Sequence, residues 1–507
     1  MQPHIIVAIS LAVLGLAPAA AEAACDCDHV IAVDQVSLDG DALGVKPGQS
    51  VCLAPGQRAA LRLANFHGTE EAPIVIRNCD GVAHIENQDR GYGLTVDTSE
   101  HLQITGTGDA SAPYGIYVRA AKVAAGPGDY SAMGVAVSGY SHYLEIDHLE
   151  IVDAGFAGIM VKTDPTCESP DLREHVQREV RLHHNLIRNP GGEGFYLGST
   201  GYPSRTRNCS GTDIQTYPHR HEGLYVHDNV VEDAGWDGLQ IGVTPKDCHV
   251  YRNTIIRPGR LNEEFQSQGF QFGGTSSCVV HSNHLRGGPA MGIIILEAGD
   301  MKVYNNVIAD FGGAGIYANL RDAGPAGARY QFLHNTVIRA AQEGIQVFGP
   351  GLGDSVAYNN LVLESGAAAV SAGGDVAWDA SNNIVDATVD DVGFVDPDAF
   401  DFRLKPTSIA VDAGRALADF DISVDADDVD RDDTPDIGAF EYIEGPRPED
   451  PDGPGAPGNP GDPDAPGNPG EGSGDGGCAV TGGAHASWLL LALMALVLST
   501  RRSRRGC

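Results

Sequence analysis

Six-residue phrases with asparagine at the fourth position recur along the chain: LHHNLI (182–187), VHDNVV (226–231), VYRNTI (250–255), VHSNHL (280–285) and VYNNVI (303–308). The pattern continues around Asn335, Asn360 and Asn383. Successive asparagines are 23 to 44 residues apart, and the spacing of 23 occurs twice. A recurring minimum with variable excess predicts a structural repeat of about 23 residues that carries loop insertions.

A second phrase, Gly-apolar-x-apolar, alternates with the asparagine phrase. It begins at Gly158, Gly194, Gly238, Gly269, Gly292, Gly315 and Gly344. Two short runs of period-two apolar residues in each repeat indicate short strands rather than helices. A strand too short to bury its own face must stack on copies of itself, so the sequence predicts an all-β, right-handed parallel β-helix with N- and C-terminal caps. The repeated asparagines are expected to form a hydrogen-bonded ladder.

Cysteine positions give a check on the register of the coils. Cys248 and Cys278 each precede a ladder asparagine by five residues, so they are expected to lie about 4.8 Å apart and to form a disulfide. Cys167 and Cys209 follow the glycine strands of adjacent coils and are expected to pair as well. The pairing of Cys25, Cys27, Cys52 and Cys79 stays open.

The repeats have irregular flanks. Earlier segments such as PIVIRNC (73–79) and LEIDHLEI (144–151) keep the alternation. The segments DFRLKPTSIAVDAG (401–414) and PDIGAFEY (435–442) resemble the closing segment of secreted β-helix proteins. Together with the repeats they resemble the pectate-lyase-like superfamily. That resemblance implies a fold, and because the Asp-Pro-His-Asp motif of alginate epimerases is missing, it does not name the catalytic residues.

The two ends read as targeting segments. Residues 1–23 have an apolar run followed by Ala21-Glu22-Ala23, which is typical of a secretory signal peptide. After the β-helix (24–400) and an acidic cap (401–444), residues 445–477 form a Pro/Gly-rich linker. Residues 478–507 hold Cys478, an apolar run and an arginine cluster, an order that resembles a myxobacterial C-terminal sorting tail. We expect an exported monomer, tethered to the cell surface or outer membrane through this segment or through Cys478.

Charge excludes one class of partner. The 507-residue chain has 68 Asp and Glu against 33 Lys and Arg, a formal net charge of −35. Nucleic-acid binding needs clustered positive charge, so it is not expected. A polysaccharide or surface glycan is the expected partner.

The x positions of the Gly-apolar-x-apolar phrase point away from the core, because side chains alternate along a strand. They carry Tyr196, Gln240 and Gln271 in three consecutive coils. Amides exchange hydrogen bonds with sugar hydroxyls and a tyrosine ring packs on a pyranose face, so this row suits a glycan. A polar exterior stacked only for stability fits the same row equally well.

Acidic residues precede two of the glycines. Glu193 and Asp237 occupy the same phase of adjacent coils, with Trp236 beside Asp237 and Gln268 at the next equivalent position. Carboxylates about 5 Å apart suit either a retaining glycosidase pair or a calcium site. Ordinary turn chemistry between coils is the competing interpretation.

Loop insertions select one face of the helix. Loops 163–180, 199–222 and 257–266 are expected to wall a groove over the row that carries Tyr196. Lys162, Arg205, Arg220 and His221 supply positive or titratable groups there. A cation beside metal-binding carboxylates is suited to β-elimination of a uronic acid. His183 and His184 flank the ladder and are interpreted as surface histidines.

The leading hypothesis is therefore a carbohydrate-active protein, a polysaccharide lyase or a glycoside hydrolase. Its expected catalytic residues are Glu193, Asp237 and Lys162, and calcium is the candidate cofactor. The alternatives are a non-catalytic glycan-binding adhesin and a purely structural surface protein.

Overall fold

The computed structural model describes residues 26–445, except residues 88, 122–131, 322, 350 and 374–375. The expected signal peptide, the linker beyond Gly445 and the anchor segment with Cys478 lie outside the described residues. Within the described part of the chain, no helix is long and apolar enough to cross a bilayer.

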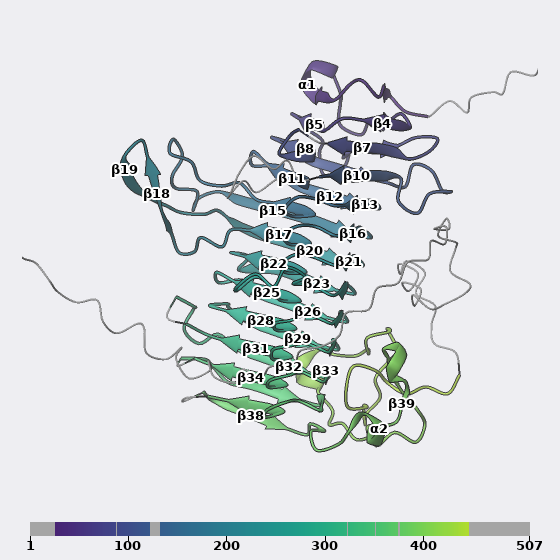
Figure 1. The fold of residues 1–507 in the computed structure, drawn as a ribbon, viewed down its shortest axis with the longest axis vertical. Helices are drawn as coiled ribbons and strands as arrows, with labels where there is room; N and C mark the ends of the chain where they lie inside the picture. The colour runs from purple at the N-terminus through teal and green to yellow at the C-terminus, as the bar shows by residue number, and fades with distance from the viewer. Residues whose placement is uncertain are drawn as a thin grey trace, which may run out of the picture. The chain divides into compact units, whose positions relative to one another are not determined.

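Three long parallel sheets run along the molecule, and each coil contributes one strand to each sheet (Figure 1). Sheet 1 precedes the ladder asparagines. Its 13 strands are β1 (His29–Ile31), β3 (Ser50–Leu53), β6 (Ile74–Asn78), β9 (Glu100–Thr105), β12 (His142–Asp147), β15 (Val176–His183), β20 (Arg220–His227), β23 (Lys246–Tyr251), β26 (Cys278–His281), β29 (Met301–Tyr304), β32 (Tyr330–Leu333), β35 (Ser355–Tyr358) and β38 (Trp378–Ser381).

Sheet 2 follows the ladder asparagines. Its 11 strands are β4 (Gly56–Arg58), β7 (Ala83–Asn87), β10 (Ile116–Ala120), β13 (Leu149–Val152), β16 (Leu186–Arg188), β21 (Val230–Glu232), β24 (Thr254–Ile256), β27 (His284–Arg286), β30 (Val307–Ala309), β33 (Thr336–Ile338) and β36 (Leu361–Leu363).

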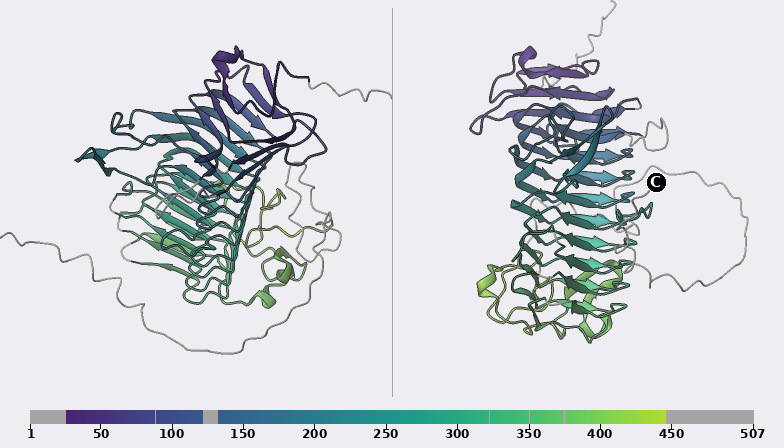
Figure 2. Two further views of the ribbon diagram at one scale, coloured as in Figure 1. Left: turned by 45° about the horizontal axis from the view of Figure 1, so that its top comes forward. Right: turned by 90° about the vertical axis from the view of Figure 1, so that its left-hand side faces the viewer.

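Sheet 3 is built from the Gly-apolar-x-apolar phrases. Its 12 strands are β2 (Ser37–Asp39), β5 (Leu61–Ala64), β8 (Tyr92–Asp97), β11 (Met133–Ser138), β14 (Ile159–Val161), β17 (Phe195–Gly198), β22 (Leu239–Gly242), β25 (Phe270–Gly273), β28 (Ile293–Leu296), β31 (Ile316–Asn319), β34 (Ile345–Phe348) and β37 (Val370–Ala372). The chain therefore forms the predicted right-handed parallel β-helix, which Figure 2 shows from two further sides.

The asparagine ladder is continuous from Asn185 to Asn383. The Asn229 side-chain amide donates to Asn253 Oδ1 at 3.0 Å, and Asn253 donates to Asn283 in the same way. The residue before each ladder asparagine is left-handed, with φ between 50° and 57°. This conformation turns the chain sharply between sheets 1 and 2, and the buried amides satisfy the backbone groups that the turn exposes.

Two disulfides have the predicted pairing. Cys248 and Cys278 are Cα partners on β23 and β26 with a Cα–Cα distance of 4.5 Å. Cys167 is bonded to Cys209. At the N-terminal end, Cys27 pairs with Cys52, which resolves part of the pairing that the sequence left open.

The C-terminal cap covers the outer face of the last strands of sheet 2. The stack ends at β38, and α2 (Val389–Val392), β39 (Phe394–Asp396) and β40 (Asp401–Leu404) follow it, so the chain leaves the stack before residue 400, the expected boundary (Figure 1). Phe394, Phe402 and Phe440 pack against sheet 2. The acidic residues of the cap close its loops: Asp425 accepts hydrogen bonds from the backbone amides of Asp427, Val429 and Glu441.

The remaining small elements are α1 (Gly40–Leu43) at the N-terminal end and the antiparallel hairpin of β18 (Arg205–Cys209) and β19 (Thr212–Thr216). The hairpin projects from the side of the stack in Figure 1. The disulfide between Cys167 and Cys209 ties this hairpin to the preceding loop.

Candidate functional site

The outward row of sheet 3 has the register that the repeat predicts. Tyr196 on β17, Gln240 on β22 and Gln271 on β25 are Cα partners in consecutive coils. Met160 on β14 precedes this trio and Ile294 on β28 follows it. Phe195 and Leu197, on either side of Tyr196, are buried in the core. The alternation of the strand therefore presents Tyr196 on the outer face.

The first of two hollows on this face lies between the row and the hairpin. Its volume is about 220 Å³. It is lined by Lys162, Asp164, Pro165, Tyr196, Ser199, Gly201, Arg205, Thr206, Arg207, Thr216 and Pro218. The hollow therefore combines loop residues of the 163–180 and 199–222 insertions with the outer face of β17, as the sequence predicts.

Tyr196 is the centre of the polar contacts in this hollow. The Lys162 Nζ lies 4.3 Å from the centre of the Tyr196 ring, and it also pairs with Asp164 Oδ2 at 3.1 Å. The Tyr196 hydroxyl is 3.1 Å from Thr200 Oγ1, to which Arg205 Nη2 donates at 3.0 Å. Two cations thus flank one phenol. Thr200 connects the phenol to the second cation, Arg205. The sequence pattern did not point to Thr200.

The second hollow continues along the row. Its volume is about 160 Å³, and its lining includes Ser199, Thr200, Tyr202, Gln240, Gln271, Glu297 and Arg321. Ser199 lines both hollows, so they are neighbours on one face. With the Gln271 amide in the orientation that satisfies both of its atoms, its oxygen accepts from Gln240 Nε2 at 2.6 Å and its nitrogen donates to Asp237 Oδ2 at 3.3 Å. Gln240 is only 2% exposed, so the accessible amide of this pair is Gln271.

The predicted catalytic carboxyls lie beneath the groove rather than in it. Glu193 is 1% exposed and Asp237 is 0% exposed, and neither lines either of these two hollows. Burial raises the pKa of Glu193 to about 7, against a smaller lowering effect of Lys162. Burial also raises the pKa of Asp237 well above its ordinary value, and the neighbouring Glu193 adds to that effect. The two carboxyls are near each other, as predicted, but burial removes them from the outer face of sheet 3.

Asp237 and Gln268 belong to a second internal ladder. Asp237 Oδ1 accepts from the Gln268 backbone amide at 2.7 Å, and Gln268 Oε1 accepts from the Met291 amide at 2.9 Å. Both residues therefore close turns between sheets 2 and 3, which is the structural interpretation of these positions. Glu193 differs, because its Oε2 is buried and has no hydrogen-bond partner among the described residues.

The other side chains that were expected to contact substrate are buried or are bonded to other residues of the protein. His221 is fully buried, and burial lowers its pKa well below the ordinary value. The neighbouring His219 and His175 lower this pKa further, by smaller amounts. Arg220 donates to Glu222 at 3.1 Å and to the Arg173 carbonyl at 2.8 Å. Trp236 is half-buried and packs edge-on against Phe156, with ring centres 5.4 Å apart. These side chains and Gln268 support the groove from below or beside it.

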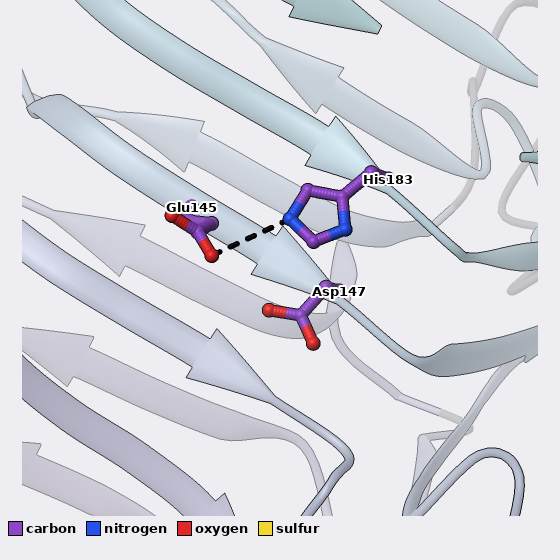
Figure 3. A group of neighbouring side chains, drawn as sticks. All are labelled: Glu145, Asp147 and His183. Atoms are coloured by element: carbon purple, nitrogen blue, oxygen red, sulfur yellow. Dashed lines mark hydrogen bonds and ion pairs between the residues drawn. The ribbon is translucent and has the colours of Figure 1, made fainter. Parts of the chain in front are cut away.

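The structure supplies little for the expected calcium site at Glu193 and Asp237. Calcium takes six to eight oxygen ligands, whereas burial raises the pKa of both carboxyls and so disfavours the charged form that binds the ion, and the described residues bring no third acidic or histidine ligand to them. Three potential ligands converge elsewhere, on the outer face of sheet 1. These are Glu145, Asp147 and His183 (Figure 3). The register that aligns Asp147 with His183 was available from the repeat, but β12 precedes the regular coils.

Comparison with known proteins agrees with this architecture. A family model described as a right-handed beta helix region matches residues 212–389. The fold is a right-handed parallel β-helix. Comparison with curated protein sequences finds no match.

Several solved structures are similar to this chain at low sequence identity. An alginate lyase from Paenibacillus sp. strain FPU-7 is 16% identical, with a TM-score of 0.34 over 70% of this chain and 99% of that one. The pectate lyase Pel9A is 14% identical, with a TM-score of 0.41 over 82% and 97%. The periplasmic alginate epimerase AlgG is 12% identical, with a TM-score of 0.44 over 70% and 84%.

Proposed function

We propose that this β-helix protein is carbohydrate-active, binding an acidic polysaccharide in the groove on sheet 3 and cleaving it by β-elimination. The observation that carries the proposal is the arrangement around Tyr196, where Lys162 covers the ring and Arg205 reaches the hydroxyl through Thr200. This arrangement lies on the accessible side of sheet 3, unlike the buried pair Glu193 and Asp237.

The charge of the first hollow favours an anionic glycan. Its lining holds Lys162, Arg205 and Arg207 against the single acidic residue Asp164. The chain as a whole has a formal net charge of −35, so a local excess of positive charge stands out against its surroundings. Guanidinium groups bind carboxylates through paired hydrogen bonds, which suits the C6 carboxylate of a uronic acid.

The geometry supports elimination over hydrolysis. Hydrolysis by a carboxyl pair requires both groups to reach the glycosidic bond, and Glu193 and Asp237 are covered. In elimination, a base removes the C5 proton, a C4–C5 double bond forms, and the C4–oxygen bond breaks as the leaving oxygen is protonated. The Tyr196 hydroxyl is the group placed to move the proton: as the phenolate it takes the C5 proton, and as the resulting phenol it gives that proton to the leaving C4 oxygen, while Lys162 and Arg205 stabilise the negative charge that develops on the uronate.

The test is incubation of the protein with a panel of neutral and acidic polysaccharides, following both reducing ends and the ultraviolet absorbance of unsaturated uronates. Elimination predicts new absorbance with uronate polymers and none with neutral glycans. Reducing ends without that absorbance would instead establish hydrolysis and refute the proposed chemistry.

A glycan-binding protein without catalysis is the second candidate. It is favoured by the burial of Glu193 and Asp237, which removes the acid–base pair from the surface while Tyr196, Gln271 and the arginines stay accessible. Retained binding to a uronate polymer without any turnover would select this alternative.

We also propose that the protein is exported and tethered through its C-terminal segment. Three disulfides among the described residues fit an oxidising compartment. Fractionation of the producing cells tests this: the protein is expected at the cell surface, and its release after removal of residues 478–507 would support the tether.

A further inference from the structure

Three side chains with metal-ligating atoms meet on the outer face of sheet 1, on a different sheet from the proposed substrate groove. Glu145 and Asp147 lie two residues apart on β12, and His183 ends the neighbouring strand β15 (Figure 3). Asp147 and His183 are Cα partners in the parallel pairing of these strands. The ligand atoms of all three residues lie within 4.8 Å of one another.

The spacing of these atoms is close to that of a tetrahedral centre. Nitrogen and oxygen ligands lie about 2.1 Å from a zinc ion, so two ligands of a tetrahedral site are about 3.4 Å apart. Glu145 Oε1 and His183 Nε2 are already separated by 3.4 Å. Only Asp147 requires a small adjustment to complete a three-ligand face.

Neighbouring side chains hold the three groups in this orientation. Gln103 Nε2 donates to Glu145 Oε1 at 2.9 Å and to Asp147 Oδ2 at 3.2 Å, which keeps the carboxylates side by side. His183 Nδ1 lies 2.9 Å from His184 Nδ1, and this contact leaves Nε2 of His183 directed at the carboxylates. Such outer contacts are typical of metal-binding histidines, whose second ring nitrogen is bonded elsewhere.

The negative charge of the pair is not balanced by lysine or arginine in the described part of the chain. Arg181 is the Cα partner of Glu145, yet its guanidinium pairs with Glu179 at 3.1 Å and lies 4.3 Å from the centre of the Tyr225 ring. The ion-pair contacts of Glu145 and Asp147 are instead to histidines. Two adjacent carboxylates facing an imidazole, with the nearest guanidinium turned away, form an environment that attracts a cation.

We propose that Glu145, Asp147 and His183 bind a divalent transition-metal cation of the zinc class. An imidazole ligand and a set of only three side chains suit zinc and its neighbours, whereas calcium and magnesium take oxygen ligands in larger numbers. Glu145 and Gln103 also line a hollow of about 440 Å³, which makes the Glu145 side of the site accessible to an ion from solution. The cation joins two consecutive coils of sheet 1, and it is independent of the proposed substrate groove.

Calorimetric titration of the full-length, chelator-treated protein tests this site, with zinc chloride and calcium chloride as separate probes. We expect zinc to bind at least about tenfold more tightly than calcium, and E145Q and H183A each to weaken zinc binding by at least about tenfold. The matched controls are E150Q, on the outer face of sheet 2, and H249A, two coils beyond His183 on sheet 1, and both are expected to bind zinc like the parent protein.

Thermal unfolding without metal establishes that each variant folds. Added zinc is expected to raise the thermal unfolding midpoint of the parent protein but not that of H183A. Cobalt in place of zinc provides a spectroscopic check, because its visible absorption reports an ordered coordination sphere. Zinc binding that is unchanged in both E145Q and H183A would overturn the assignment. Tighter binding of calcium than of zinc would also overturn it.

Discussion

The Lys162 ammonium lies 4.3 Å from the centre of the Tyr196 ring, across the boundary between two consecutive coils. Lys162 follows β14 directly, and Tyr196 is the outward residue of β17. Because parallel stacking fixes both backbones, the pair is placed by the core and not by the flexibility of a loop. This contact is the reason to assign chemistry to Tyr196 and not to the other tyrosine of the same row, Tyr317.

The first prediction concerns the phenol. Y196F removes the hydroxyl that contacts Thr200 while keeping the ring under Lys162, so we expect turnover of a uronate polymer to fall by about 10²- to 10⁴-fold with little change in affinity. Y317F is the matched control, because Tyr317 has the same outward position on β31 and its hydroxyl accepts a hydrogen bond from Asn319 Nδ2. Steady-state kinetics of both variants decide the matter; equal activity of Y196F and Y317F would remove Tyr196 from the mechanism.

The second prediction concerns the positive charge of the groove. K162M deletes a cation that faces the first hollow, so we expect the affinity for an acidic polysaccharide to fall about tenfold at low salt and less at high salt, because salt screens the lost attraction. K246M changes an exposed lysine on sheet 1 and serves as the control. Affinity measured at two ionic strengths checks both; a loss that is the same for neutral and acidic glycans would contradict the electrostatic role.

The third prediction concerns the buried acid beneath the groove. Burial raises the pKa of Glu193 from 4.5 to about 7, so the folded protein holds this proton more tightly than the unfolded chain. The contribution of Glu193 to the free energy of unfolding is therefore largest near and below pH 4.5. This contribution falls by ~3 kcal/mol as the pH rises toward 7 and above. E193Q carries no titrating group, so its stability is expected to lose that part of the pH dependence.

Denaturant unfolding at pH 5 and pH 8 measures this effect. E193Q is expected to gain stability relative to the parent protein between pH 5 and pH 8, whereas D164N, at an exposed carboxylate, is expected to follow the parent curve. The pKa of Asp237 shifts in the same direction, mainly through burial, and Asp237 is left intact in both variants, so only the part of its shift that comes from Glu193 changes in E193Q. Parallel curves for E193Q and the parent would show that Glu193 does not titrate as proposed.

The fourth prediction concerns the asparagine ladder. Asn283 Oδ1 accepts from the backbone and side chain of Asn253, and its Nδ2 donates to Val250, His281 and Asn306. N283A leaves several buried polar groups without partners, and each costs about 1–3 kcal/mol, so a loss of ~3 kcal/mol or more is expected. N262A, at an exposed loop position, is the control. Urea unfolding that places both variants at the same midpoint would contradict the structural role of the ladder.

The repeats made the fold predictable from sequence to the level of single residues. The asparagine phase set the register, and the register in turn correctly paired Cys248 with Cys278 and aligned Tyr196 with Gln240 and Gln271. These inferences depend only on equal spacing in a stack. The last strand of the stack, β38, ends at Ser381, within the range 24–400 that the sequence assigned to the β-helix.

Site residues were harder to predict, because phase along the helix does not give depth. Glu193 and Asp237 share a phase, but the turn between sheets 2 and 3 directs them beneath the surface, where they are 1% and 0% exposed. His221 appeared to belong to a basic loop, yet it is the second residue of β20 and is buried. Conversely, Thr200 joins Tyr196 to Arg205 through loop geometry that has no periodic signal.

The last prediction separates the two disulfides whose pairing the register set. Cys167 is exposed and fastens the β18–β19 hairpin beside the first hollow, whereas Cys248 and Cys278 are each 2% exposed within sheet 1. The double variant C167S/C209S is expected to lower glycan affinity several-fold, because the loop that presents Arg205 and Arg207 loses its tether. The double variant C248S/C278S is expected to leave affinity unchanged and to lower the free energy of unfolding by up to ~4 kcal/mol, the chain-entropy value for a loop of 30 residues.

Glycan affinity and unfolding midpoints measured on both double variants test this difference between the two disulfides. Mild reductant provides an independent check, since it is expected to open the exposed bond first. Equal loss of glycan affinity in the two double variants would show that the hairpin does not form a wall of the groove.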